Sequence, residues 1–144
     1  MAPRRLNPDW LLVPIGLLYF GSFLLPAYEG KRTTITPGIM YGIGAFIYGI
    51  FGLSVACPVW LANVFFWKGV VMLRTKRWGR VVFTGGVASL LALFPLCGYD
   101  IDGGKGHLLI GYFAWLGSMV LLTLSGVLGL LMSGGCRNTP TWRS

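Results

Sequence analysis

The residues that could do chemistry are few and lie far apart in the sequence. His107 is the sole histidine, and Cys57, Cys97 and Cys136 form neither a CxxC pair nor a cluster with it. Zinc sites and redox-active dithiols need closely spaced ligands, so we expect no metal site. The chain also has no nucleophile–base pair, no paired carboxylates and no phosphate-binding glycine motif. These absences predict a protein that is not an enzyme and has no catalytic residue.

Two weaker chemical hypotheses concern His107 and the first two cysteines. His107 is a weak candidate for an axial ligand of a cofactor, and the alternative is a solvated or helix-capping histidine. Cys57 and Cys97 are equally distant in sequence from Arg77, so a helical hairpin centred there would bring both thiols to one level. The two cysteines then either form a disulfide or remain reduced as small buried apolar residues. No cofactor is predicted, although the many aromatic residues are compatible with a bound lipid or pigment.

Asn63 and Lys68 are polar residues inside otherwise apolar runs. A buried amide in a membrane usually bonds a neighbouring helix, and the alternative for Asn63 is contact with a substrate or ion. Lys68 can extend toward headgroups and pair with a lipid phosphate. A proton relay would need an acid within the membrane, which argues against proton-coupled transport. The four acidic residues all lie at segment ends or in loops: Asp9, Glu29, Asp100 and Asp102.

The composition indicates that these residues are held by membrane helices. Hydrophobic residues make up 55% of the 144 residues, charged residues only 11%, and the mean hydropathy is +0.70. A soluble domain carries about 25% charged residues, which this chain cannot provide. We therefore expect an all-α integral membrane four-helix bundle, with residues 1–144 as a single membrane domain. The expected crossings cover about residues 10–28, 54–73, 81–98 and 108–132, each sufficient for roughly 30 Å of hydrocarbon.

The apolar run over residues 38–73 is too long for one crossing, because a single straight helix would extend about 54 Å. Pro58 interrupts it, and Thr36-Pro37 looks like a helix cap followed by a first-turn proline. The sequence therefore predicts an extra helix over about residues 37–56 at the outer face. This helix is either re-entrant or the tilted part of a broken helix.

Small residues recur along this predicted helix at steps of four and three: Gly38, Gly42, Ala45, Gly49, Gly52 and Ala56. Such a seam lets another helix approach closely, which replaces the hydrophobic drive that is absent in lipid. Weaker versions recur at Gly85, Ser89 and Ala92 and at Gly111, Ser118 and Ser125. The smooth faces either pack against each other inside the bundle, or the 37–56 seam docks onto another subunit or a flat cofactor.

The basic residues predict the orientation in the membrane. With the N-terminus inside and four crossings, nine Lys and Arg fall on the cytoplasmic side and three outside. The inner residues are Arg4, Arg5, Lys68, Arg74, Lys76, Arg77, Arg80, Arg137 and Arg143. This bias follows the positive-inside rule, so both termini are expected in the cytoplasm, and the basic residues are topology signals rather than a nucleic-acid site.

Three segments, "LLPAYEG", "VWLANVFFW" and "GYFAWLGSMVLL", resemble those of small uncharacterised multi-spanning proteins of bacterial inner membranes. The resemblance covers about half the chain and implies a location in the bacterial inner membrane, without implying an activity. The chain is similar in size to small multidrug-resistance transporters but lacks their glutamate in the first helix.

These features together predict a non-catalytic accessory or scaffolding subunit of a larger membrane complex, respiratory, photosynthetic or transport. Its expected partners are the lipid bilayer and other membrane subunits, with no nucleic acid. The alternative is a small homo-oligomeric channel or transporter in which Asn63 and the glycine seam line a path. A third hypothesis is a redox protein that uses Cys57 and Cys97.

Overall fold

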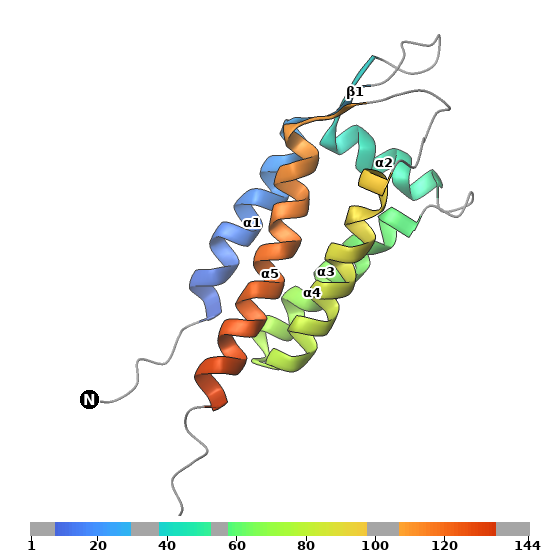
Figure 1. Ribbon diagram of the computed structural model, residues 1–144. Coiled ribbons are helices and arrows are strands. Elements are labelled where there is room, and N and C mark those ends of the chain that lie inside the picture. The colour runs from blue at the N-terminus through green and yellow to red at the C-terminus, as the bar shows by residue number, and fades with distance from the viewer. Residues whose placement is uncertain (1–7, 30–37, 53–57, 98–106, 135–144) are drawn as a thin grey trace, which may run out of the picture.

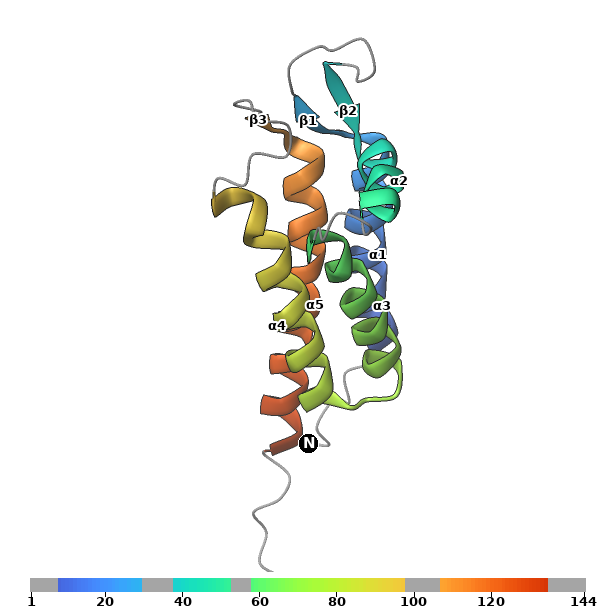
Figure 2. The same cartoon turned by 90° about the vertical axis from the view of Figure 1, so that its right-hand side faces the viewer.

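The computed structural model describes residues 8–29, 38–52, 58–97 and 107–134. Within these residues the chain forms five α-helices and a small three-stranded sheet (Figures 1 and 2). Four helices lie lengthwise beside one another: α1 (Pro8–Leu24), α3 (Leu61–Arg74), α4 (Trp78–Leu93) and α5 (Ile110–Gly134). The predominantly helical class predicted from the sequence is confirmed, whereas the sheet was not predicted.

Several helix ends coincide with prolines. α1 starts at Pro8, whose missing N–H is not needed in a first turn. It ends at Leu24, because Pro26 disfavours a helical backbone at Leu25. The short 3-10 helix η2 (Pro58–Trp60) leads directly into α3, and α4 passes into the 3-10 helix η3 (Phe94–Cys97), which contains Pro95. These prolines therefore lie at both ends of α1, at the start of α3 and at the end of α4.

The segment predicted as one helix over 37–56 has a different organisation. Residues Ile39–Tyr41 form strand β2, and the helix that follows, α2, covers only Gly42–Gly52. α2 packs on α1 at the end of the molecule that carries the sheet (Figure 2). The difference has a local cause, because Ile39–Tyr41 pairs with a strand that directly follows α1, and this pairing delays the start of the helix.

The sheet ties three connections together at one end of the molecule. β1 (Pro26–Glu29) is the central strand and pairs antiparallel with β2 on one side and β3 (His107–Leu108) on the other. Two further backbone bonds extend this joint, from Gly42 N–H to the Leu25 carbonyl at 3.0 Å and from Leu109 N–H to the Ala27 carbonyl at 2.9 Å. The ends of α1, α2 and α5 are therefore fixed to one another by backbone pairing.

The turn between α3 and α4 is closed by backbone hydrogen bonds at the other end. Arg77 N–H donates to the Met72 carbonyl and Lys76 N–H to the Leu73 carbonyl, each at 3.0 Å. Lys76 has a positive φ of 55°, the left-handed conformation that usually selects glycine after a helix. The turn is thus a Schellman motif with lysine in the glycine position.

α4 and α5 pack with their backbones close together. A Cβ placed on Gly85 would lie 2.7 Å from Thr123 Oγ1 and 3.1 Å from the Thr123 backbone. A Cβ on Gly126 would lie 2.9 Å from the backbone nitrogen of Val82. Both distances are shorter than side chains tolerate, so glycine is required on each helix for this approach. Ser89 Oγ and Thr123 Oγ1 add a 3.4 Å hydrogen bond across the same contact.

α1 and α3 pack in another way, through large aromatic rings. Tyr19 of α1 stacks on Phe66 of α3 with ring centroids 4.4 Å apart and planes 6° from parallel. Tyr19 also meets the edge of Trp67 at 5.4 Å, and Phe20 lies 6.0 Å from Trp67. Tyr19 and Phe66 are each only 1% exposed. These rings fill the space between two helices whose backbones stay apart.

Replacing Gly85 with alanine should destabilise the fold by about 1–3 kcal/mol, because the added methyl group overpacks the contact with Thr123. Gly86→Ala is the matched control, since open space surrounds the Cβ position of Gly86 on the same helix. That control should be neutral or gain up to about 1 kcal/mol of helix propensity. Denaturant titration of the purified chain, followed by circular dichroism, measures both. Equal effects of the two substitutions would contradict the close approach of α4 and α5.

Candidate functional site

The central polar feature is a hydrogen-bonded group of three side chains, Tyr19, Asn63 and Trp115, here called the polar centre. Tyr19 O–H donates to Asn63 Oδ1 at 3.0 Å, and Trp115 Nε1–H donates to the same oxygen at 2.9 Å. The three residues lie on α1, α3 and α5. One amide oxygen therefore links three of the four lengthwise helices.

The surroundings of the polar centre are apolar and densely packed. Asn63 is 6% exposed, and its neighbours in the core include Tyr19, Phe66 and Ala62, each at most 1% exposed. A carbonyl oxygen has two lone pairs, and both are used by the aromatic donors. The Asn63 oxygen consequently has no lone pair left to coordinate an ion or accept a bond from a substrate.

The buried serine and threonine hydroxyl groups are satisfied within their own helices. Ser22, Thr84, Ser118 and Ser125 are at most 4% exposed. Each donates to a backbone carbonyl three or four residues earlier, at distances between 2.6 and 2.8 Å. Such local bonds let a hydroxyl lie in an apolar interior without a partner on another element. These serines and the threonine act as small packing residues rather than as nucleophiles.

The predicted small-residue seam is divided among different structural elements. Gly38 precedes strand β2, Gly42 begins α2, Ala45 lies within α2, and Ala56 lies outside the described residues. A Cβ on Gly42 would collide with the Ser22 carbonyl oxygen at the end of α1. Gly42 therefore serves a contact inside this chain. Gly49 and Gly52 also lie in α2, in a part of the helix whose packing is outside the description.

The other sequence-predicted residues whose side chains the structure describes, His107 and Lys68, lie on separate elements. His107 is exposed in β3, in register with Glu29 of β1. Lys68 is exposed on α3. Cys57 lies outside the described residues and the Cys97 side chain is not described, so the hypothesis of a disulfide between them stays a prediction. Among the described residues, no group of three His, Cys, Asp or Glu side chains is placed to hold a metal ion.

Sequence reasoning selected Asn63 but missed Tyr19 and Trp115, its two donors. Both are aromatic residues with a polar atom, placed in helices that the sequence predicts to be wholly apolar. The signal that could have found them is the need of a buried amide for donors on other helices, since the O–H of tyrosine and the N–H of tryptophan are such donors. Tyr112 plays a related part, because its hydroxyl donates to the Ala92 carbonyl and links α5 to the end of α4.

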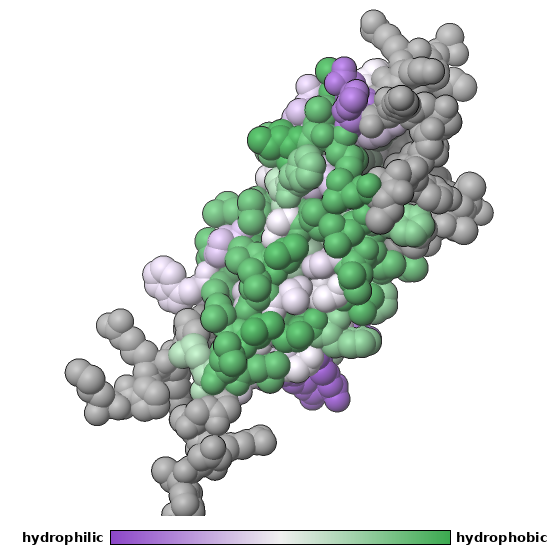
Figure 3. All heavy atoms as spheres, viewed as in Figure 1, coloured by the Kyte–Doolittle hydropathy of each residue, from purple (hydrophilic) through white to green (hydrophobic). Residues whose placement is uncertain are grey.

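The outer surface of the lengthwise helices is apolar. Large exposed side chains occur on each of them, for example Leu17 (70% exposed), Val71 (56%), Phe83 (67%) and Leu131 (70%). Figure 3 shows hydrophobic residues over most of the visible side of the molecule. Within the described residues, Ile110–Ser133 is the one helical stretch that meets both the length and the composition needed to cross a membrane. In the most apolar part of this stretch, 39% is buried inside the molecule. The apolar stretches Trp10–Leu24 and Trp78–Leu93 are shorter.

Comparison of the chain with known protein families, with curated proteins and with solved structures gives no match in any of the three. The resemblance of its segments to small bacterial inner-membrane proteins stays a prediction.

Removing the Asn63 amide should lower the free energy of unfolding, because it leaves the buried donors of Tyr19 and Trp115 without an acceptor. Asn63→Leu should destabilise the fold by about 1–3 kcal/mol. Tyr19→Phe keeps the ring stack on Phe66 and removes one hydrogen bond, at a cost of about 1 kcal/mol. In the Asn63→Leu background the Tyr19→Phe change should cost nothing or restore stability, because no acceptor for the hydroxyl remains.

A double-mutant cycle of unfolding free energies measures this coupling. Tyr41→Phe is the control, since Tyr41 is 55% exposed and should give no coupling to position 63. Strictly additive effects of the substitutions at positions 19 and 63 would show that the two side chains are not bonded.

Proposed function

We propose that this chain is a non-catalytic accessory or scaffolding subunit of a larger complex in the bacterial inner membrane. The observation that carries the proposal is the contrast between its exterior and its interior. Large apolar side chains are exposed on all four lengthwise helices, while the buried polar groups described above bond within the chain. A protein with this contrast gains by contact with lipid or with other apolar helices.

The helix lengths support residence of α3, α4 and α5 in a bilayer when the 3-10 extensions of α3 and α4 are included. α5 has the length of a crossing on its own. α4 with η3 would extend about 32 Å, and α3 with η2 about 27 Å, at the usual rises of the two helix types. These values are close to the roughly 30 Å of a hydrocarbon core. α1, the fourth crossing in this proposal, continues into β1 at the end that carries the sheet.

The distribution of charge supports an orientation with both termini in the cytoplasm. The α3–α4 turn carries exposed Arg74, Lys76 and Arg77, and Arg80 follows in the first turn of α4. This turn lies at the same end of the molecule as the start of α1 and the end of α5 (Figure 2). Basic residues concentrate on the cytoplasmic side of inner-membrane proteins. The sheet and α2 would then lie at the outer face.

The surface proposed to bind another subunit is the exposed side of α2. Ile43 (55% exposed), Ile47 (48%) and Ile50 (43%) project from this short helix. They follow one another at spacings of four and three residues, so they share one face. α2 is attached to the end of α1 rather than inserted among the lengthwise helices. It therefore presents a ridge of isoleucines that a neighbouring membrane helix can cover.

The channel alternative meets a specific obstacle in the polar centre. Both lone pairs of the Asn63 oxygen are used, and Tyr19 and Phe66 fill the space beside it. A permeating ion would have to displace these bonds and rings. Any conducting path would consequently run between several copies of the chain, and self-association becomes the property that separates the two functions.

The first test is native mass spectrometry of the tagged chain after purification in a mild detergent. We expect other polypeptides to remain bound at a constant ratio. A clean homo-oligomer with no other polypeptide would refute the accessory role and support the channel. A detergent-free monomer that stays in solution would refute membrane residence itself.

A paired substitution tests the α2 surface. Ile43→Ala combined with Ile47→Ala should reduce retention of the partner about tenfold, equivalent to about 1.4 kcal/mol. Leu124→Ala combined with Leu128→Ala is the matched control, because these residues have the same spacing and similar exposure on α5 (51% and 48%). Partner retention is measured by quantifying co-purified polypeptides against the tagged chain. Gly42→Leu is unsuitable here, since it would disturb the contact with α1 inside this chain. An equal loss of partner retention in the two double variants would show that the partner does not bind specifically to the exposed side of α2.

A further inference from the structure

We propose that a hollow between α3 and α4 binds the phosphate of an anionic phospholipid between Lys68 and Arg80. The hollow has a volume of about 230 Å³ and is lined by Phe65, Lys68, Met72, Arg80, Phe83 and Thr84. The proposal rests on the membrane residence proposed above and adds a specific lipid site to it.

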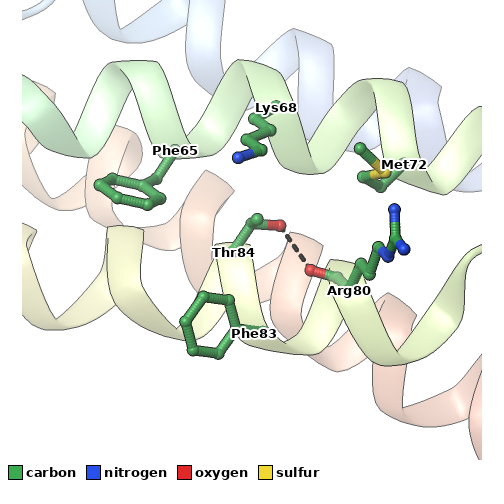
Figure 4. Close-up of a pocket in the computed structure, with 6 residues that line it drawn as sticks. All are labelled: Phe65, Lys68, Met72, Arg80, Phe83 and Thr84. Carbon is green, nitrogen blue, oxygen red and sulfur yellow. Dashed lines mark hydrogen bonds between the residues drawn. The ribbon is translucent and has the colours of Figure 1, made fainter.

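Along the hollow the lining changes from two aromatic rings at one end to Arg80 beside Met72 at the other, with Lys68 between them (Figure 4). Phe65 and Phe83 lie at the end nearer the middle of the helices, and Arg80 lies at the end nearer the α3–α4 turn. Lys68 lies on the α3 wall of the hollow, with its ammonium group toward Phe65, and Arg80 lies on the α4 wall, with its guanidinium group beside Met72. A phospholipid changes in the same direction, with acyl chains toward the membrane interior and the phosphate toward the surface.

Among the side chains that the structure describes, no acidic group lies beside the two cations. Of the four acidic residues, Glu29 is the one whose side chain is described, and it lies in β1 at the opposite end of the molecule. Arg74, Lys76 and Arg77 lie nearby and add positive charge. Basic pockets between helices on the cytoplasmic side of a membrane attract anionic headgroups. An arginine also binds phosphate oxygens through two N–H groups at once.

Thr84 contributes little to binding a phosphate directly. Its hydroxyl already donates to the Arg80 carbonyl at 2.8 Å. This bond and the adjacent close packing of Gly69, whose Cβ would lie 2.9 Å from Thr84 Oγ1, fix the floor of the hollow. The preformed floor means that the site does not have to be assembled when the lipid binds.

The size of the hollow favours one part of a large amphiphile over a whole small molecule. Sites that enclose a drug-sized ligand have volumes of about 300–1,000 Å³, which is more than the 230 Å³ measured here. A headgroup phosphate and the adjoining glycerol can occupy the hollow, while the acyl chains lie against exposed apolar residues such as Phe83 and Leu90 on α4.

The test measures lipid binding to the full-length chain in detergent by native mass spectrometry. The probes are phosphatidylglycerol and phosphatidylcholine with identical acyl chains. We expect the wild-type chain to retain phosphatidylglycerol about tenfold better than phosphatidylcholine. Lys68→Gln combined with Arg80→Gln should abolish this preference.

Arg74→Gln combined with Lys76→Gln is the charge-matched control, because both residues are exposed in the adjacent turn and neither lines the hollow. This variant should keep most of the preference. An equal loss in the two double variants would show general attraction to a basic surface and overturn the site. An unchanged preference in Lys68→Gln/Arg80→Gln would overturn it as well.

The conservative pair Lys68→Arg and Arg80→Lys separates loss of the site from loss of the fold. It keeps both charges, so it should retain the preference for the anionic lipid, and circular dichroism verifies that every variant is folded. Failure of the two proposals is distinguishable. A chain that binds both lipids equally is a membrane protein without this site, whereas a chain that binds neither lipid and needs no detergent is not a membrane protein.

Discussion

The structure depends on one amide oxygen in an apolar interior. A buried polar group without partners costs about 1–3 kcal/mol, so Asn63 must be met by donors wherever the helices come together. Tyr19 and Trp115 meet it from two other helices. Two bonds of ordinary length to one atom fix both the rotation and the axial position of α1 and α5 relative to α3. Apolar packing alone tolerates sliding and rotation, and this bonded oxygen removes that freedom.

The helices pack around Asn63 in two different ways, and the difference sets how closely each pair of helices approaches. α4 and α5 approach closely because Gly85 and Gly126 remove side chains from the contact. α1 and α3 stay apart because Tyr19, Phe66 and Trp67 fill the space between them. The long side chain of Tyr19 carries its hydroxyl across this wider side to Asn63. Close backbone contact and aromatic filling thus occupy opposite sides of the same interior.

The sequence predicts the helices better than it predicts what joins them. Apolar runs and Pro58 set the approximate extent of the lengthwise helices, although the first was expected to reach residue 28 and ends at Leu24, before Pro26. Asn63 stands out as a polar residue in an apolar run. The sheet could not be predicted, because its strands are two to four residues long and become strands only by pairing with each other. The predicted glycine seam starts before the helix does, since Gly38 precedes strand Ile39–Tyr41, and four of its six residues lie within α2. Close-packed glycines such as Gly85 have the spacing expected of a contact, but spacing does not identify the partner helix.

The position of the polar centre has a consequence for the order in which the chain is assembled. The bonds to Asn63 span 44 residues toward the N-terminus and 52 residues toward the C-terminus. During synthesis, α1 and α3 are complete long before Trp115 emerges, and β1 must likewise wait for β3 to complete its pairing. Contacts between segments so distant in sequence form late. The half-made protein therefore carries an amide with one of its two donors missing, and the last helix both closes the sheet and completes the interior.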